Sequence, residues 1–493
     1  MVVAGVALHF LLYGASLPFL FSMDDRKFVL DCPEVTGQRS LSSALAQPWA
    51  YGEGARGVNY RPVTVLSLGL DVRLFGLQPG PLRSANLLLA GVGAGLFGLL
   101  VRSLGASPFA GWWSVVLLSC HPVRSEPVLS IAARGEVLAF LFLVGALLLR
   151  RRAVLSASLL LLALLSKENS FVAPGLLALV VLFEGRVGGG PDEPPPEDRP
   201  ARARQLRRLA CAWGGAFALA FAARWAVLGG LLTGSASRIS PADNLLAALS
   251  PIHRLMGALS LFPLAVARLF WPTTLSPDYS RTTFLVDDLL SASSVAWGAA
   301  VLVSAASLAA VLLLVPAVRK RAPLAGFGLV WALVSYVPFA NFLFPTGIVF
   351  TERLLFLPAA GIAVAAAAAG EALRGAGRGR PAARLSAALA GVLLALLGGA
   401  RIVEHLPDWQ DDRTLMEAIV RDLPANSKAH WNLALLSLGE GKNAEASRHL
   451  ARALALDPNY RESAGELVRH AEELGRWDQA EALSAAVRAS RGR

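Results

Sequence analysis

The sequence predicts an all-α membrane protein whose apolar helices cross a bilayer many times and are followed by a short helical repeat. The composition supports this, because 55% of the 493 residues are hydrophobic and only 16% are charged. Soluble domains have about 45–50% apolar and about 25% charged residues. A change in character gives the second part of the prediction, since no long apolar run occurs after about Glu404.

The predicted transmembrane helices are the long apolar runs of residues 1–403. A helix needs roughly 17–25 mainly apolar residues to cross a bilayer, and fewer where the bilayer is thinned. No small-residue cleavage site with a basic region before it marks the first run, so we expect it to be retained as a span. The segments that fit are 2–22, 83–101, 107–120, 131–149, 153–165, 169–184, 209–230, 293–317, 322–343, 354–373 and 384–402.

The net charge of +11 is explained by orientation in the membrane and not by nucleic acid binding. The basic residues gather in short loops between apolar runs, and such loops face the cytoplasm. With the N-terminus in the cytoplasm and eleven spans, all the basic loops fall on the cytoplasmic side. They are Arg150-Arg151-Arg152, the 185–208 loop, Arg319-Lys320-Arg321 and the 374–384 loop.

Three segments between the spans have distinct expected roles. The Gly- and Pro-rich linker 185–208 is predicted to be disordered and cytoplasmic. The apolar segment 254–272 contains Arg268, and counting it as a span would move one basic loop outside, so we interpret it as an interfacial or re-entrant helix. The outer side then carries the loop 23–82 and the loop 231–292.

Residues 404–493 are predicted to form a domain like the tetratricopeptide repeat on the outer side. Pro424 and Pro458 are 34 residues apart, which is the period of that repeat. One good unit is expected between two degenerate ones. Its role stays open between a structural cap and a groove that binds an acceptor polypeptide or another partner. The expected packing positions are Leu433, Ala434, Ala446, Leu450 and Ala453.

The acidic pair Asp24-Asp25 directly follows the first apolar segment. A carboxylate at a membrane surface can take a proton from a hydroxyl as a general base while a lipid-linked donor lies in the bilayer. Both residues are therefore candidate catalytic residues. The competing interpretation is that the pair only ends a helix at the interface.

Further charged residues are predicted to lie on the same face. A charge at mid-bilayer costs about 2.5–3.5 kcal/mol on insertion scales, so such residues face a polar cavity or pair with each other. An arginine fork suits phosphate oxygens. The alternatives are an Arg134–Glu136 pair, an interface anchor at Lys167 and a helix cap at Glu352-Arg353. The candidates are His121, Glu126, Arg134, Glu136, Lys167, Glu168, Glu352 and Arg353.

The sequence indicates neither a metal site nor a disulfide framework. His121 has no suitably spaced second histidine, so a structural role is favoured over metal binding. The three cysteines Cys32, Cys120 and Cys211 lack metal-ligand spacing. The one pairing considered is Cys32–Cys120, because both residues are predicted to face an oxidising compartment.

The chain resembles the transmembrane and tetratricopeptide-repeat-containing (TMTC-like) O-mannosyltransferases, and the resemblance rests on an ordered set of short motifs. It extends over nearly the whole chain, but Cys32 stands where a small polar residue is usual, and the repeat region is short. The motifs are Asp24-Asp25, Asp31-Cys32-Pro33-Glu34-Val35, Tyr60-Arg61-Pro62-Val63-Thr64, His121-Pro122-Val123-Arg124-Ser125-Glu126, Ala133-Arg134-Gly135-Glu136, Ser166-Lys167-Glu168, Leu275-Ser276-Pro277-Asp278-Tyr279-Ser280, Phe344-Pro345 through Glu352-Arg353, and Trp409.

The resemblance implies a GT-C fold and sugar transfer from a polyprenyl-phosphate sugar, which is dolichyl phosphate mannose in eukaryotes, to Ser or Thr of exported proteins. Asp24 then matches the catalytic carboxylate, and Arg61 joins the donor-binding candidates. We expect a single inverting displacement in which Asp24 or Asp25 is the base. Arg134, Lys167 and Arg353 are the candidates to stabilise the leaving phosphate.

In this interpretation no cofactor is obligatory, and a divalent metal is not indicated. The Ala, Arg and Gly bias suggests a bacterial protein, so we expect an inner-membrane location with the repeat on the periplasmic side. Two other functions remain open. One is a non-catalytic membrane scaffold whose repeat recruits partners, and the other is an enzyme that glycosylates a lipid or a cell-envelope glycan.

Overall fold

The structure is a computed structural model that describes residues 1–49, 59–184, 199–230, 239, 244–279, 281–314, 323–376 and 381–490. Within these ranges the regular elements are helices, with no β-strand and two isolated β-bridges. The predicted linker residues 185–198 and the basic loop Arg319-Lys320-Arg321 lie outside the described residues. The all-α prediction is confirmed for the described chain.

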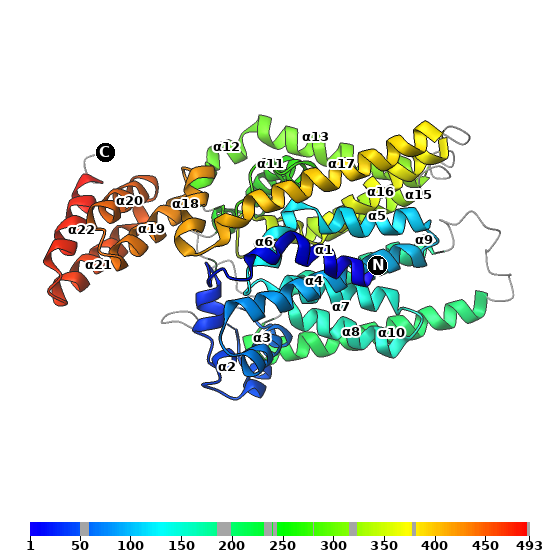
Figure 1. The fold of residues 1–493 in the computed structure, drawn as a ribbon, viewed down its shortest axis with the longest axis horizontal. Coiled ribbons are helices and arrows are strands. Elements are labelled where there is room, and N and C mark those ends of the chain that lie inside the picture. Colours follow the sequence, from blue (N-terminus) through cyan, green and yellow to red (C-terminus); the bar gives the residue numbers. More distant parts are fainter. Residues whose placement is uncertain are drawn as a thin grey trace.

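The apolar part of the chain is an elongated bundle whose longer helices run along a common direction, and the repeat region extends from one end of it (Figure 1). Short helices form most of the first long loop. The bundle helices are α1 (Val2–Tyr13), α4 (Pro79–Ser103), α5 (Pro108–Ser119), α6 (Ser125–Leu129), α7 (Arg134–Leu148), α8 (Ala153–Ser166), α9 (Ala173–Phe183), α10 (Arg199–Leu228), α11 (Pro251–Phe270), α12 (Val286–Leu290), α13 (Ala292–Leu314), α15 (Pro323–Tyr336), α16 (Pro358–Ala376) and α17 (Pro381–His405), with α2 (Pro33–Thr36) and α3 (Pro62–Phe75) in the loop.

Five of the described helices are long and apolar enough to cross a membrane, and a sixth span results if the pair Pro122–Leu129 and Arg134–Leu148, bent by 111°, counts as one. Five shorter apolar helices accompany them. The chain is therefore a multi-pass membrane protein, and the count of eleven spans stays a prediction. The interfacial position of 254–272 also stays a prediction, because α11 meets the criteria for a span by length and composition.

The predicted linker 185–208 is too long at its C-terminal end. Helix α10 already begins at Arg199, so its basic residues 199–208 are helical and not disordered. The physical reason is that Pro200 is suited to the first turn of a helix and that Ala, Arg, Gln and Leu, which follow it, are strong helix formers. The Gly and Pro content of 185–198 does not extend into this stretch.

Small residues let α1 and α4 approach each other closely. A Cβ atom added to Gly91 would lie 2.5 Å from the Cα of Val6, and the positions of Gly5 and Gly95 are equally restricted by backbone of the other helix. Such close crossings replace the missing hydrophobic driving force between helices in a bilayer with van der Waals contact. This crossing fixes the direction in which the chain leaves α1.

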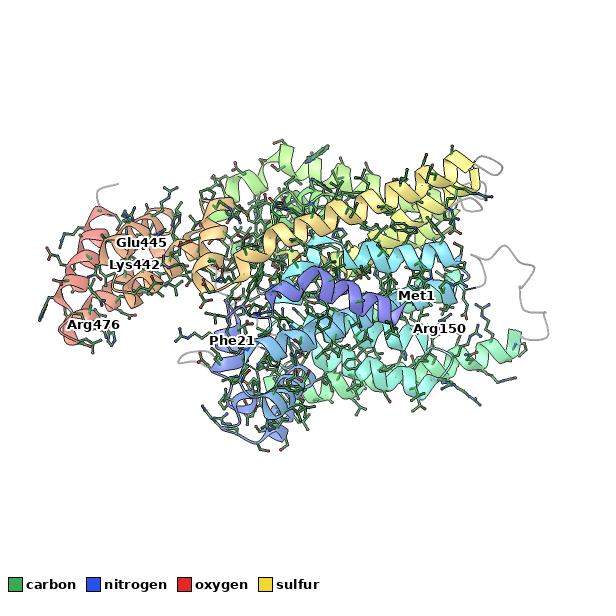
Figure 2. The ribbon with its side chains drawn as sticks, viewed as in Figure 1. Met1, Phe21, Arg150, Lys442, Glu445 and Arg476 are labelled. Carbon is green, nitrogen blue, oxygen red and sulfur yellow. The ribbon has the colours of Figure 1, made fainter. Side chains whose placement is uncertain are left out.

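The two ends of the bundle carry different groups of residues. Met1 and Arg150 lie toward one end, whereas Phe21 lies toward the end from which the repeat extends (Figure 2). Arg150 donates a hydrogen bond from Nη1 to Ser103 Oγ at 3.3 Å, so the α4–α5 and α7–α8 connections share the first end. We name the opposite end, which receives the chain after α1, the Asp24 end.

A buried arginine orders the chain between α1 and the Asp24 end. The Arg83 side chain donates hydrogen bonds to the carbonyl oxygens of Ser16, Phe19 and Leu20 at 2.8–3.0 Å, and to that of Leu129 at 3.1 Å. Ser16, Phe19 and Leu20 follow α1 and Leu129 is the last residue of α6, so their carbonyls lack the i+4 N–H partner of a continuing helix. Arg83 therefore joins the segment that leads from α1 to Asp24 to the segment that leads from α6 to α7.

The repeat region consists of α18 (Asp412–Asp422), α19 (Ser427–Gly439), α20 (Asn443–Leu456), α21 (Arg461–Glu473) and α22 (Trp477–Ala489). Helices α19 and α20 pack as one pair and α21 and α22 as a second, while α18 covers the side of α19. This is the helix-pair arrangement that the sequence predicts. The predicted packing residues are all buried, namely Leu433, Ala434, Ala446, Leu450 and Ala453.

All three cysteines are free, and Cys32 and Cys120 are both buried. The Cys32–Cys120 pairing considered from the sequence is therefore not formed. Cys32 Sγ instead lies 3.5 Å from Glu34 Oε2, to which it donates. The cysteine thus packs inside the first loop and makes no covalent link to α5.

We expect Gly91→Ala to destabilise the bundle, because the added Cβ would overlap the Val6 backbone on α1. Overpacking of this kind costs about 1–3 kcal/mol. Thermal unfolding of the detergent-solubilised protein should show a lower midpoint. The matched control is Gly214→Ala on α10, where an added Cβ meets nothing within 4 Å. Equal midpoints for the two variants would contradict the close crossing.

Candidate active site

The acidic pair stands in an unusual stretch of backbone at the Asp24 end. Met23 has a φ of +53°, a left-handed conformation that side chains other than glycine seldom adopt. A single π-helical turn, Arg26–Leu30, follows the pair, and Asp25 is its N-cap. Isolated π turns are frequent at functional sites. The backbone therefore sends two adjacent carboxylates into different surroundings.

Asp25 is fully buried and accepts hydrogen bonds from the backbone around it. Its Oδ1 accepts the N–H of Ala132 at 2.7 Å, and its Oδ2 accepts the N–H of Ser22 at 3.3 Å. Burial raises the pKa of Asp25 to about 6, and the two N–H donors counter only part of that effect. Asp25 thus joins the end of the first span to the start of α7 and has no solvent-facing side.

Asp24 keeps one third of its side chain exposed and forms an ion pair with Arg353. Arg353 Nη1 donates a hydrogen bond to Asp24 Oδ2 at 3.2 Å. Partial burial alone would raise the pKa of Asp24, but the charges of Arg353 and Lys428 outweigh it and lower that pKa. The carboxylate is therefore ionised at neutral pH and accessible, as a proton acceptor must be.

Arg353 connects Asp24 to a second carboxylate, that of Glu126 in α6. Its Nε lies 2.9 Å from Glu126 Oε1, and its backbone N–H donates to Glu126 Oε2 at 3.1 Å. Thr351 Oγ1 donates to the same Oε2 at 3.0 Å. Burial acts to lower the pKa of Arg353, but Glu126 and Asp24 overcome it and raise that pKa. Arg353 therefore stays a cation.

The turn that presents Arg353 is braced from within by Asn341. Asn341 has a φ of +63°, and its amide donates to the carbonyl oxygens of Ile348 and Val349 at 3.2 and 3.1 Å. Its Oδ1 accepts the N–H of Thr346 at 2.9 Å. Asparagine tolerates the left-handed region because its short side chain can bond locally. The residues before Arg353 are thereby held in one conformation.

Lys167 and Glu136 form an ion pair beside the Arg353 cluster. Asn169 donates from Nδ2 to the second oxygen of Glu136 at 2.7 Å. Lys167 stands directly after α8, whose last carbonyl, at Ser166, accepts from Thr64 Oγ1 at 2.9 Å. The end of α8 is thus bonded to α3, which fixes the position of the Lys167 backbone.

Glu168 is held by two arginines. Arg61 Nη2 lies 2.8 Å and Arg224 Nη1 3.0 Å from its two oxygens. Arg61 also lies over the ring of Trp49, 5.9 Å from its centroid. The three charges bring together the first loop, the α8–α9 connection and α10.

These ion pairs constitute one polar cluster at the Asp24 end. The charge of Glu136 acts on Arg353, that of Lys167 acts on Glu126, and those of Arg61 and Arg353 act on Lys167. The structure therefore brings together most of the residues that the sequence singled out. We name them the ionic cluster, which comprises Asp24, Arg61, Glu126, Glu136, Lys167, Glu168, Arg224 and Arg353.

Arg134 is not in the ionic cluster. Its guanidinium is fully buried and donates to Asn86 Oδ1 and Leu82 O, each at 2.7 Å, and to Asp71 Oδ2 at 2.5 Å. The alternative Arg134–Glu136 pair is not formed, because Glu136 pairs with Lys167. Arg134 offers no free face to a ligand in this conformation and ties α7 to α3 and α4.

Glu352 and His121 each make structural contacts. Glu352 accepts from Tyr279 Oη at 2.5 Å and from the N–H of Ser276 at 3.1 Å. Burial raises the pKa of Glu352 to about 8, and these two donors only partly offset it. His121 Nε2 is 2.8 Å from the carbonyl oxygen of Leu269 at the end of α11. Glu352 thus binds the segment of Ser276 and Tyr279, and His121 binds the end of α11, beside the cluster.

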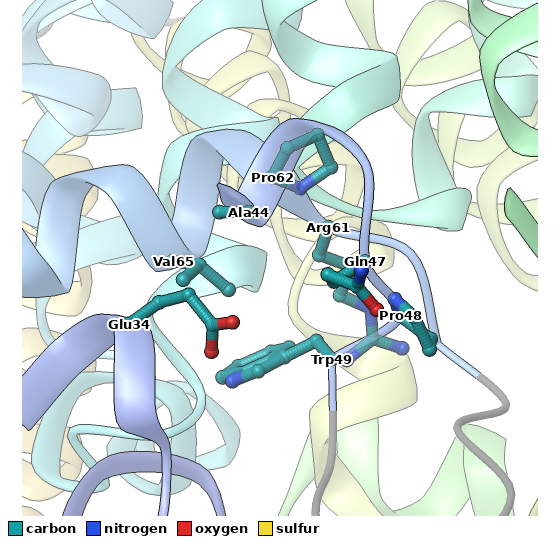
Figure 3. Close-up of a pocket in the computed structure, with 8 residues that line it drawn as sticks. All are labelled: Glu34, Ala44, Gln47, Pro48, Trp49, Arg61, Pro62 and Val65. Atoms are coloured by element: carbon teal, nitrogen blue, oxygen red, sulfur yellow. The ribbon is translucent and has the colours of Figure 1, made fainter. Parts of the chain in front are cut away.

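Two shallow pockets border the cluster. One has a free volume of only about 10 Å³, room for about one water molecule, and combines Glu136 and Asn169 at its polar end with apolar side chains. Its apolar lining is Ala139, Phe140, Leu143, Phe356 and Leu357. The other lies in the first loop between Arg61, Glu34 and Trp49 (Figure 3). Glu34 and Trp49 are almost fully buried, so it is mainly a packing feature.

Comparisons with known proteins show what the sequence is similar to. A tetratricopeptide repeat family model matches residues 437–492. Protein O-mannosyl-transferase TMTC1 of Mus musculus is 26% identical over 91% of the chain, and the protein of the same name from Homo sapiens is 24% identical over 91%. Protein O-mannosyl-transferase F38B6.6 of Caenorhabditis elegans is 22% identical over 92%. The chain is therefore similar to TMTC proteins over most of its length.

The TMTC-like chain is shorter than these relatives. It matches 57% of the length of the mouse protein, 54% of the human protein and 62% of the nematode protein. No solved structure matches the chain. The similarity extends over most of the chain and so covers both the bundle and the repeat.

Several cluster and supporting residues of the TMTC-like chain are not among the sequence-based candidates. Arg224 lies within the predicted span 209–230, and a charge in an apolar run is itself a signal of a polar partner. Asp71 in the apolar helix α3 carries the same signal. Asp412 and Lys428 carry none, because charged residues are ordinary in a soluble repeat. In the described residues no group of three or more His, Cys, Asp or Glu side chains could hold a metal ion.

We expect Asp25→Ala to destabilise the TMTC-like chain more than Asp24→Ala. The first change leaves the buried N–H groups of Ala132 and Ser22 without a partner, at a cost of about 1–3 kcal/mol for a buried group. The second removes a partly exposed ion pair, which contributes about 0–1 kcal/mol. Thermal unfolding in detergent compares the two variants. A greater loss for Asp24→Ala would overturn the division of roles.

Proposed function

We propose that the chain is a membrane glycosyltransferase that transfers mannose or a related hexose from a polyprenyl-phosphate donor to Ser or Thr hydroxyls of exported proteins. The relatives that match most of the chain are named protein O-mannosyl-transferases, which supports the acceptor class and the sugar. In this proposal the protein lies in a bacterial inner membrane with the Asp24 end and the repeat on the outer side.

The observation that carries the proposal is the accessible carboxylate of Asp24 paired with Arg353. A base for a hydroxyl must be ionised, reachable from solvent and fixed in direction. Asp24 meets these needs with one third of its side chain exposed and one firm partner. Asp25 does not meet them, because it is fully buried and bonded to backbone N–H groups. The structure thus favours Asp24 as the base.

The proposed reaction is a single inverting displacement. The Asp24 carboxylate takes the proton of the acceptor hydroxyl as its oxygen forms a bond to the anomeric carbon of the sugar. The bond between that carbon and the phosphate oxygen breaks, and its electron pair stays on the phosphate. The products are the glycosylated hydroxyl and the polyprenyl phosphate, and Asp24 releases its proton to solvent.

Arg353 and Lys167 are proposed to receive the phosphate, with Arg61 beside them. The side chains of Arg353, Arg61 and Lys167 are 20%, 18% and 11% exposed, whereas that of Arg134 is 0% exposed. Only the first three can therefore meet a ligand without repacking the bundle. Fixed cations aimed at a developing negative charge are effective where water is excluded. In this proposal no metal ion is obligatory, since these cations supply the positive charge.

The polarity of the α7 face beside Glu136 suits a lipid-linked donor, although its side chains must move to admit one, because the free volume there is about 10 Å³. Glu136, Ala139, Phe140 and Leu143 occupy one face of α7 at helical spacing, so the lining changes from polar to apolar along the helix. Ligand sites combine a mainly apolar wall with a few placed polar groups. An isoprenoid next to its phosphate has the same order of polarity, and we propose that the first isoprene units lie along this face.

We expect the purified protein, in lipid nanodiscs with polyprenyl-phosphate mannose and a Ser/Thr peptide, to produce a mannosylated peptide. Asp24→Asn should reduce the transfer rate at least about 10²-fold, which is the lower range for loss of a general base. Asp25→Asn should reduce it less, because the amide oxygen can still accept the N–H of Ala132. Mass spectrometry of the peptide measures the product.

The matched control is Asp287→Asn in α12, which removes an exposed carboxylate outside the ionic cluster. Reactions are run with and without EDTA. Undiminished transfer by a correctly inserted Asp24→Asn protein would refute the base assignment. Transfer of mannose to lipid or glycan and not to peptide would favour the alternative enzyme. No transfer by the wild type or by any variant would favour the scaffold.

The pH dependence of kcat/KM should report the partnership of Asp24 with Arg353. Because the pKa of Asp24 is lowered, its carboxylate stays ionised when the pH falls to the value at which an ordinary aspartate would take up a proton. Arg353→Gln removes the charge that opposes burial, so the pKa of Asp24 should rise. Activity should then be lost at a higher pH on the acid side than in the wild type.

Arg353→Lys is the control, since it keeps a positive charge next to Asp24. Its acid limb should stay closer to that of the wild type, even where its maximal rate is lower. An acid limb that is the same in Arg353→Gln and the wild type would show that Asp24 does not titrate in that limb. The measurement compares profile shapes, so a loss of donor affinity does not obscure it.

A further inference from the structure

The strained residue before Asp24 is held by the repeat region. The N–H of Met23, at a φ of +53°, donates to Asp412 Oδ1 at 2.5 Å. Left-handed backbone in a residue other than glycine costs of order 1–3 kcal/mol and persists only where the surroundings over-determine it. Asp412 is the first residue of α18. The first repeat helix therefore fixes the conformation from which Asp24 projects.

Asp412 has a fixed position of its own. The N-cap Asp411 accepts the N–H of Thr414 at 2.9 Å, and Thr414 Oγ1 accepts the N–H of Asp411 at 3.1 Å, which completes a capping box. One residue earlier, the carbonyl oxygen of Gln410 accepts the N–H of Leu20 at 2.9 Å. The start of α18 and the chain that leads to Asp24 are thus joined at two points.

A second repeat residue, Lys428 in α19, acts electrostatically on the same carboxylate. Its Nζ forms an ion pair with Asp278 Oδ2 at 3.0 Å, and its charge acts on Asp24. The other charges that interact with Asp24 are the cations Arg353 and Lys27 and the carboxylates of Asp25 and Glu126. Lys428 is thus held by the loop that contains Asp278 while its charge acts on the candidate base.

The start of α19 is attached to that outer loop by further hydrogen bonds. Asn426 donates from Nδ2 to the carbonyl oxygen of Asp278 at 3.0 Å. Thr282 Oγ1 donates to the carbonyl oxygen of Ala425 at 2.5 Å and accepts the N–H of Ser427 at 3.0 Å. The repeat thus contacts two separate outer segments, one on each side of Asp24.

We propose that α18 and α19 are part of the catalytic site, with Asp412 and Lys428 as positioning residues for Asp24. This inference rests on the proposed function and deepens it. Asp412 sets the backbone direction of the base, and Lys428 helps to keep its carboxylate ionised and oriented. The repeat is therefore not a tethered module, and a polypeptide held on it reaches Asp24 at a fixed distance.

The experiment compares positioning variants with matched controls in the nanodisc transfer assay. Asp412→Ala should lower kcat about 10-fold or more, because a misplacement of about 1 Å can cost 10²-fold, with a smaller change in KM. Asp412→Asn should stay near the wild type, since its amide oxygen can still accept the Met23 N–H. The control is Glu417→Ala, which removes an exposed carboxylate from the same helix.

Lys428 is tested through the pH profile. Lys428→Met should move the acid limb of kcat/KM to higher pH, because one of the charges that lowers the pKa of Asp24 is lost. Lys428→Arg should restore the wild-type limb. The control is Lys442→Met, which removes an exposed lysine paired with Glu440 inside the repeat.

Amide hydrogen exchange supplies a readout that does not require activity. Exchange at Met23 should be faster in Asp412→Ala than in the wild type and unchanged in Glu417→Ala. Wild-type kcat, pH profile and Met23 exchange in Asp412→Ala and Lys428→Met, with Asp24→Asn inactive, would overturn the positioning roles and leave the proposed function intact. Absence of transfer in the wild type would overturn the proposed function, and Met23 exchange would still decide whether the repeat holds this backbone.

Discussion

The arrangement of the Asp24 end depends on the charge of Arg353. A largely buried guanidinium must be paired, because an isolated buried charge is strongly unfavourable. Arg353 satisfies this need with Asp24 and Glu126, which come from segments after α1 and in α6. These two carboxylates repel each other unless the cation lies between them. Three parts of the chain are therefore brought to one point by a single requirement for charge balance, and the strained turns at Met23 and Asn341 are tolerated there because they present the partners to each other.

The ionic cluster is balanced in the absence of a donor, with the carboxylates of Asp24, Glu126, Glu136 and Glu168 set against Arg61, Lys167, Arg224 and Arg353. In the proposed reaction an incoming phosphate must compete with these carboxylates for a cation. If Arg353 turns toward the phosphate, Asp24 loses the charge that most opposes its burial, and its affinity for a proton rises. Binding of the donor phosphate by Arg353 would then itself make Asp24 a stronger base.

The sequence predicted the helices well and the partners poorly, and the reason is physical. Long apolar runs indicate their own burial, so each predicted span contains a helix in the described residues, although the run 2–22 is α-helical only to Tyr13 and the run 322–343 only to Tyr336. The charges in or next to these runs also signalled polar partners, and most of the candidates lie in the cluster. Pairing is tertiary, however: Arg353 and Asp24 are 329 residues apart, and no local pattern links them. The end of the linker at Arg199 was missed because its composition was extrapolated from 185–198. Asp412 and Lys428 look like ordinary surface residues of a repeat, so only the fold reveals their contacts with Met23 and Asp278.

The different fates of Asp24 and Asp25 show why an acidic doublet could not be resolved by its sequence. The two residues have the same side chain and adjacent positions, and their intrinsic pKa values are equal. What separates them is the surrounding backbone. Asp25 accepts hydrogen bonds from the N–H groups of Ala132 and Ser22. These bonds offset part of the cost of burying its carboxylate. Asp24 points to Arg353 at the edge of the solvent. In the proposed function the doublet therefore combines a structural acid, Asp25, with a candidate base, Asp24, and the first holds in place the backbone that carries the second.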